Sequence, residues 1–148
     1  MNKIDFMPME SCHVDGVFHI SEISFHLPWS ITSIRNELNN GLARYIVAVD
    51  NGKVVGYGGA WFIVDEGHIT NIAVLPEYRK QHIGSGILKN LIEECKNECI
   101  VAMTLEVRSS NISAQSLYKK FDFVGEGIRK RYYADNGEDA IIMWKRNL

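Results

Sequence analysis

The sequence has few cysteines, no long apolar run and no excess of basic residues, and each shortage excludes a class of protein. Its three cysteines are an odd number, which does not fit a fold held together by disulfides. No apolar run approaches the roughly 20 residues that a membrane-spanning helix needs. The formal net charge is −2, so the broad basic field of a nucleic-acid-binding protein is missing. We therefore expect neither a membrane protein nor direct binding of nucleic acid.

The composition that is present is that of an ordinary globular protein. Hydrophobic residues make up 46% of the 148 positions and charged residues 23%, enough apolar surface for a core. This length predicts one domain over residues 1–148. The first five residues lack the apolar segment of a signal peptide, so we expect a cytoplasmic protein. The oligomeric state stays open, with a monomer as the simplest case.

Two local clusters each have a functional and an ordinary interpretation. Cys95 and Cys99 are spaced for one helix face, but no nearby histidine or third cysteine completes a metal shell. We expect both to pack within a helix, and we expect no metal. The basic residues 129–131 fit either a solvated surface or a contact with a partner.

Hydrophobic periodicity predicts two helices, three strands, a helix, a strand, a helix and a final pair of strands. Ile23 falls on the apolar face of the first helix, and Ser30 is a candidate N-cap for the second. Turn signals at 50–52 and 65–67 bound the glycine-containing second strand, where a bulge is allowed. The fold class is therefore α/β or α+β with a mixed central sheet. The predicted elements cover residues 14–23, 30–40, 45–49, 54–63, 68–74, 83–97, 101–107, 113–120, 123–127 and 140–144.

Residues 71–88 contain the most informative pattern, a strand followed by a short loop and a helix. The loop carries Arg79 and Lys80, and glycines lie at the start of the helix. Unpaired N–H groups and the helix dipole at such a terminus favour an anion such as a diphosphate. The ordinary alternative is a glycine-containing turn with solvated charges. Neither the dinucleotide-binding fingerprint nor a nucleotide P-loop fits these glycines.

Residues 105–123 form a second pattern of strand, asparagine and helix. Alternation turns Leu105 and Val107 to one face of the strand and Glu106 to the other. Asn111 and Tyr118 are seven residues apart, nearly the same side of a helix. Taken alone, these residues fit a solvated glutamate, a helix cap and a packing aromatic. Helical spacing predicts that the buried stripe consists of Ala114, Leu117 and Phe121.

Together the two segments resemble the GNAT superfamily of N-acetyltransferases. The first has its strand ending in Ile-Ala-Val, its Pro-x-Tyr-Arg turn and its glycine loop, and the second has its Leu-Tyr helix. The resemblance implies a mixed, mostly antiparallel sheet with splayed strands and flanking helices, and acetyl-CoA as cosubstrate. The residues that it assigns to acetyl-CoA are Ile72, Ala73, Val74, Arg79, Lys80, Gln81, His82, Ile83, Gly84, Ser85 and Asn111.

The glycine loop departs from the family pattern at one position. His82 replaces the first loop glycine in the frame fixed by Pro76 and Tyr78. A second frame, ending in Gly84 and Gly86, fits the motif two residues further on. We prefer the first frame, which leaves two roles open for His82: hindering the approach of phosphate to the backbone, or holding phosphate when protonated.

The expected chemistry explains two further residue types. A protein α-amine has a pKa of ~8, so a base must remove a proton before the nitrogen can attack a thioester. Glu106 is the candidate base, provided that partial burial raises its pKa. The resemblance gives Tyr118 the role of acid toward the departing thiolate, and no cysteine nucleophile is required.

Two more segments, residues 25–30 and 131–143, resemble the RimI branch, whose members acetylate the N-terminal alanine of a small-subunit ribosomal protein. This resemblance implies a protein N-terminus as acceptor. The candidate substrate contacts are Trp29, Asn71 and Tyr133, although packing explains Trp29 and Tyr133 equally well. The alternatives are a GNAT enzyme that acetylates lysine or a small amine, and a non-catalytic acyl-CoA sensor. Retention of both Glu106 and Tyr118 argues against the sensor.

Overall fold

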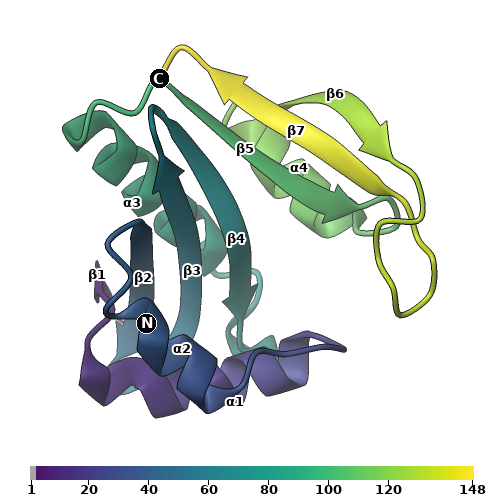
Figure 1. Cartoon of the computed structure of the whole chain (residues 1–148). Coiled ribbons are helices and arrows are strands. Elements are labelled where there is room, and N and C mark those ends of the chain that lie inside the picture. The colour runs from purple at the N-terminus through teal and green to yellow at the C-terminus, as the bar shows by residue number, and fades with distance from the viewer. Residues whose placement is uncertain (1–2) are drawn as a thin grey trace.

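A seven-stranded sheet runs through the molecule in the computed structural model, which describes residues 3–148 (Figure 1). Helices α1 and α2 lie on one face of this sheet, and α3 and α4 lie on the other. No helix in this range is long and apolar enough to cross a bilayer. In chain order the elements are β1 (Ile4–Pro8), η1 (Ser11–His13), α1 (Val14–Ser24), α2 (Ile31–Glu37), β2 (Ala43–Asp50), β3 (Lys53–Ile63), β4 (Glu66–Val74), η2 (Pro76–Tyr78), α3 (Ile83–Asn97), β5 (Ala102–Arg108), α4 (Ile112–Lys120), β6 (Val124–Arg129) and β7 (Ala140–Arg146).

The strand order is β1-β2-β3-β4-β5-β7-β6, and β4–β5 is the parallel pair in an otherwise antiparallel sheet. This pairing is short, because it covers only residues 66–68 of β4 and 102–104 of β5. Beyond it the two strands diverge, as Figure 1 shows. The predicted mixed, mostly antiparallel sheet with splayed strands is therefore confirmed.

A bulge bends β4 just past the residues that pair with β5. Gly59 of β3 pairs with Asn71, whereas the next residue, Ala60, pairs with Ile69, so Thr70 is an extra residue in β4. A second bulge makes Val55 an extra residue in β3, next to Gly56, within the strand where the sequence allowed one. Such insertions bend a strand and redirect its side chains.

Glycines in β3 let α3 pack closely on the sheet. A Cβ added at Gly58 would lie 2.5 Å from Ile87 Cγ2, and one at Gly56 would lie 3.1 Å from Ile87 Cδ1. Ile87, Leu88 and Leu91 are fully buried there, and each such side chain contributes about 1.5–3 kcal/mol on burial. These glycines thus serve packing, as expected.

On the opposite face, α1 and α2 begin and end close to the predicted residues. Ser30 caps α2, because its side-chain oxygen accepts the Ser33 N–H at 3.1 Å. The expectation for Ile23 was wrong: its side chain is 50% exposed, and Ile20 takes the buried position. Val14, Val17 and Ile20 follow one another at three-residue spacing, and that stripe leaves Ile23 at its edge.

Three further expectations need correction. The strand β1 was not predicted, because its five residues are too few for a clear alternation. The turn after β3 uses Val64 and Asp65, so β4 begins at Glu66 instead of His68. Cys95 is buried in α3 as expected, but Cys99 lies beyond the end of the helix, exposed and with a φ of 60°.

Candidate functional site

The splayed edges of β4 and β5 are the centre of the candidate site. Past His68 and Thr104 the two strands no longer pair. Half of the backbone N–H and C=O groups in this part of β4 therefore face away from β3 without a strand partner. Ile72, Ala73 and Val74, which the sequence assigned to acetyl-CoA, lie on this edge. An extended ligand arm with amide groups can form hydrogen bonds with such an edge.

The loop of residues 79–82 leads into the N-terminus of α3 with an unusual backbone. Lys80 and His82 have positive φ values of 63° and 62°, whereas Arg79 has a φ of −68°. Left-handed residues in a loop that leads into a helix can direct backbone N–H groups toward one side, where they attract anions. The Gly86 N–H makes the first helical hydrogen bond, to the His82 carbonyl at 3.0 Å. The amides of residues 83–85 therefore lie in the first turn without an intrahelical acceptor.

The side chains of this loop divide into two groups. Those of residues 79–82 are exposed, whereas Ile83 is buried in the core, so only its backbone can face a ligand. A Cβ at Gly86 would overlap the Phe6 ring, which makes Gly86 necessary for the packing of α3 on β1. A Cβ at Gly84 would meet only Leu117 Cδ2, at an ordinary 3.4 Å. Gly84 is thus the loop glycine that packing does not require.

Helix α4 lies beside this terminus and carries two predicted residues. Asn111 is the N-cap of α4, and its Oδ1 accepts the Ala114 N–H at 3.1 Å. Tyr118 is only 7% exposed, and its ring packs against Phe123 with centroids 5.7 Å apart. Burial raises the pKa of Tyr118, with a smaller contribution from Tyr133, so its hydroxyl is protonated at neutral pH.

The predicted buried stripe of α4 was partly wrong. Gln115 and Tyr118 are the buried residues of this helix, whereas Ala114, Leu117 and Phe121 are only half-buried. The reason is that Gln115 turns inward to donate from Nε2 to the carbonyls of Arg108 and Ser109, at 3.0 and 3.1 Å. Apolar spacing alone does not predict a buried glutamine that satisfies the end of a strand.

Glu106 projects from the opposite face of β5. The strand register places it on the same face as Trp61 of β3, and Asn71 of β4 also points there. The carboxylate of Glu106 is 32% exposed and accepts a hydrogen bond from Arg129 Nε at 3.3 Å. This contact brings the basic residues 129–131 to the site.

Tyr133 lies within electrostatic reach of both predicted catalytic residues. Burial raises its pKa to about 12, and the charge of Glu106 is among the smaller contributions. Tyr133 in turn makes a smaller contribution to the raised pKa of Tyr118. The sequence offered packing and substrate contact for Tyr133, and this position fits both.

Arg108, which sequence reasoning missed, organises the loop that carries Tyr133. Its guanidinium lies 4.0 Å from the Tyr133 ring centroid and donates to Asp135 at 2.9 Å and to Glu138 at 3.4 Å. Hydrogen bonds from Ser110 are the main reason that the pKa of Glu138 falls to about 2. We refer to residues 130–139 as the acceptor loop. The only sequence signal for Arg108 was its place at the end of a buried strand.

Trp29 and Asn71, the other candidate substrate contacts, lie on the same side of the sheet as Glu106. Trp29 is half-buried, and its ring centroid is 6.3 Å from that of Trp61. Asn71 directly follows the bulge in β4. Glu37 of α2 is a buried residue that sequence reasoning also missed. Its charged side chain does not belong to an apolar pattern, although it lies one turn after buried Ile34.

Comparison with known proteins agrees with this geometry. The family model described as the Acetyltransferase (GNAT) family matches residues 14–123, about three quarters of the chain. The chain belongs to the GNAT acetyltransferase family. As a member of this family it is an acetyl-CoA-dependent N-acetyltransferase.

Relatives with assigned names are similar over most of their length. A Bacillus subtilis protein provisionally named ribosomal protein bS18-alanine N-acetyltransferase is 47% identical over 132 residues, which cover 88% of this chain and 87% of that protein. The Escherichia coli K12 protein of that name is 35% identical over 147 residues, covering 97% and 96%. The crystal structure of the E. coli ribosomal-protein-S18-alanine N-acetyltransferase superposes with a TM-score of 0.89 at 30% identity, covering 98% of this chain and 94% of the other.

Proposed function

We propose that this enzyme acetylates the N-terminal α-amine of a protein, with the N-terminal alanine of a small-subunit ribosomal protein as the preferred acceptor. The observation that carries the proposal is the splay between β4 and β5. Tyr118 belongs to α4, which lies on one face of the sheet, and Glu106 of β5 points to the other face. The names of the B. subtilis and E. coli relatives support the choice of acceptor. We also propose a cytoplasmic location, in keeping with three free cysteines.

Acetyl-CoA binding would use the backbone more than side chains. The amides of residues 80–85 would receive the diphosphate at the N-terminus of α3, with Arg79 and Lys80 adding positive charge nearby. The pantetheine arm would then extend along Ile72, Ala73 and Val74. The side-chain oxygen of Asn111 is occupied by its own helix cap, so its NH2 group would donate to the arm.

The chemical step would take place in a complex of both substrates. Glu106, directly or through a water molecule, would take a proton from the ammonium group so that its nitrogen can attack the thioester carbonyl carbon. The C–N bond forms, the C–S bond breaks, and the nitrogen loses a second proton as the amide forms. Tyr118 would donate its proton to the departing sulfur and regain one from the solvent. The products are the acetylated peptide and free CoA.

The acceptor peptide would lie on the face that carries α1 and α2. Glu106, Asn71 and Trp61 all point to this face, and the loop from α1 to α2 extends toward the acceptor loop beside it (Figure 1). His26 and Asp135 lie close enough for the histidine to contribute to the lowered pKa of Asp135, after the larger effect of Arg108. Trp29 and Tyr133 would then flank the first residues of an extended peptide.

An acceptor panel tests the proposal. The enzyme would be given labelled acetyl-CoA with matched peptides that begin with Ala, Ser or Leu, with an N-terminally blocked peptide containing lysine, and with polyamines. We expect kcat/KM to be highest for the Ala peptide and at least tenfold lower for the blocked lysine peptide. A preference for the blocked peptide or for polyamines would contradict the proposal and favour the lysine or small-amine alternative.

A further inference from the structure

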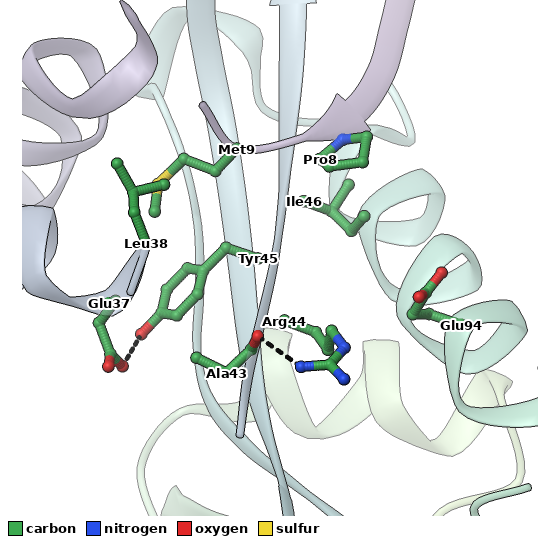
Figure 2. Close-up of a pocket in the computed structure, with 9 residues that line it drawn as sticks. All are labelled: Pro8, Met9, Glu37, Leu38, Ala43, Arg44, Tyr45, Ile46 and Glu94. Carbon is green, nitrogen blue, oxygen red and sulfur yellow. Dashed lines mark hydrogen bonds between the residues drawn. The ribbon is translucent and has the colours of Figure 1, made fainter. Parts of the chain in front are cut away.

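Glu37 is a buried carboxylate between α2 and the sheet. Its residue is only 9% exposed, and it lines a cavity of about 160 Å³ together with Tyr45 (Figure 2). Its Oε1 accepts from the Tyr45 hydroxyl at 2.9 Å and from Trp61 Nε1 at 2.7 Å. Its Oε2 accepts from Asn40 Nδ2 at 2.9 Å. Donors from β2, from β3 and from the loop after α2 therefore hold this one side chain.

None of these donors neutralises the charge of the carboxylate. Hydroxyl, indole and amide groups are neutral, and within residues 3–148 no lysine, arginine or histidine lies within ion-pair distance of Glu37. A buried carboxylate without a cationic partner costs stability. Both of its oxygens accept from neutral donors here, and glutamine, with one acceptor oxygen, could replace only part of these contacts.

The hydrogen bonds continue from Glu37 to the bulge in β4. The Tyr45 hydroxyl lies 3.5 Å from Thr70 Oγ1, and the Thr70 hydroxyl donates to Asn71 Oδ1 at 3.4 Å. Both distances are at the long end of the hydrogen-bond range. Tyr45 crosses the sheet toward Thr70 because Gly59 has no Cβ; a Cβ there would overlap the Tyr45 ring.

This chain of contacts ends at the face where the acceptor nitrogen would lie. Thr70 is the extra residue of the bulge, and Asn71 follows it on the splayed edge. Bulge residues depend on their side-chain contacts for orientation, because their backbone is not fully paired. We infer that Glu37 is a positioning residue for the acceptor amine, acting through Tyr45 on Thr70 and Asn71. This inference rests on the proposed site of transfer between β4 and β5.

Two substitutions test separate steps of this series of hydrogen bonds. Glu37→Gln keeps the size of the side chain but removes its charge, and Tyr45→Phe removes the hydroxyl that links Glu37 to Thr70 while keeping the charge. We expect each to raise the KM of the acceptor or to lower its kcat/KM by about fivefold or more, with an unchanged KM for acetyl-CoA. The double variant is expected to lose no more acceptor kcat/KM than the more impaired single variant. The reason is that substitutions in one hydrogen-bond series do not have additive effects.

Glu94→Gln is the matched control. Glu94 lines the same cavity from α3 but has no contact with the bulge, so its substitution is expected to leave the acceptor KM unchanged. Thermal unfolding would be recorded for every variant, and Tyr45→Phe serves alone if Glu37→Gln does not fold. The acceptor is whichever amine the wild type acetylates fastest in the panel, so a failed substrate proposal changes the acceptor and not the comparison. Three results would overturn the inference. They are wild-type acceptor kinetics in folded Tyr45→Phe, additive effects of the two substitutions in the double variant, and equal changes in the KM of the acceptor and of acetyl-CoA.

Discussion

Different kinds of structure lie beside the splay between β4 and β5 on the two faces of the sheet. On the α3 and α4 face, the loop of residues 79–82 has exposed side chains and a backbone with two left-handed residues. On the α1 and α2 face, the acceptor loop is held by a side-chain network around Arg108. The first face suits a ligand recognised through backbone N–H groups, and the second suits a ligand recognised through side chains.

This difference matches the two substrates of the proposed reaction. Acetyl-CoA is the same molecule for every acceptor, and main-chain amides can bind its diphosphate whatever side chains the loop carries. The acceptor varies from one enzyme to another, and side chains are the part of a protein that can adapt to it. Substitutions on the two faces should therefore alter the kinetics of different substrates.

Glu106→Gln gives the largest expected effect, on the acceptor face. Without its base the enzyme should lose about 10²-fold or more in kcat near neutral pH, the usual contribution of general base catalysis. The loss should shrink above pH ~8, where the free α-amine is plentiful. A pH profile of kcat for wild type and variant measures this, with Glu66→Gln as a control on β4. A constant deficit at every pH would count against a role as base.

Tyr118→Phe tests the donor face with the smallest structural change. The ring can still pack on Phe123, but no hydroxyl remains to donate to the sulfur. We expect kcat to fall by about 10²-fold or slightly less, while the Kd of acetyl-CoA from calorimetry stays the same. Phe123→Leu changes the packing but not the hydroxyl, and is the control. Wild-type turnover in folded Tyr118→Phe would remove the assignment.

Arg108→Lys sharpens the comparison from the acceptor side. Lysine keeps the positive charge but cannot stack on Tyr133 and bind two carboxylates with one planar group. We expect the KM of the peptide to rise about tenfold while the KM of acetyl-CoA stays constant. Steady-state kinetics with each substrate varied in turn measures the split. An equal rise in both KM values would mean that Arg108 supports the fold as a whole.

Gly84→Val tests the donor loop with a smaller expected effect. A Cβ at this position has room beside Leu117, so the variant should fold, but a branched side chain crowds the first turn of α3. We expect acetyl-CoA affinity to fall several-fold with the peptide KM unchanged. Gly84→Ala is the milder control, and its acetyl-CoA affinity should lie between those of the wild type and Gly84→Val. Unchanged calorimetric affinity in folded Gly84→Val would exclude this terminus as the diphosphate site.

His82→Gly has the smallest expected effect. The left-handed conformation of His82, with φ 62° and ψ 21°, costs a residue with a Cβ about 1 kcal/mol, which glycine avoids. The free energy of unfolding should therefore rise by less than about 1 kcal/mol, and acetyl-CoA should bind as tightly or more tightly. Calorimetry at pH 6 and pH 8 distinguishes the two roles left open for this residue. Weaker binding confined to the acidic pH would show that the imidazole holds phosphate.

The sequence predicted the parts of this fold that depend on local patterns. The long helix α3, the cap at Ser30 and the alternation around Glu106 each follow from residues close together in the chain. The short strand β1 and the exposure of Ile23 could not be predicted, because they depend on packing between distant segments.

The site was predictable to a similar extent. The resemblance located residues on both sides of the splay, with Glu106 on β5 and Tyr118 on α4. It did not reveal Arg108 or Glu37, whose partners lie up to 30 and up to 24 residues away in the chain. Networks of this kind have no periodic signature, so only the three-dimensional structure identifies them.

A bisubstrate compound tests the account most directly. CoA would be joined through its acetyl group to the α-nitrogen of an Ala-initiated peptide, and its complex with the enzyme would be solved by crystallography. The account predicts the diphosphate at the N-terminus of α3, the sulfur within hydrogen-bond distance of the Tyr118 hydroxyl, and the α-nitrogen on the face of Glu106 and Asn71. A peptide lying on the α3 and α4 face, or a sulfur far from Tyr118, would contradict it.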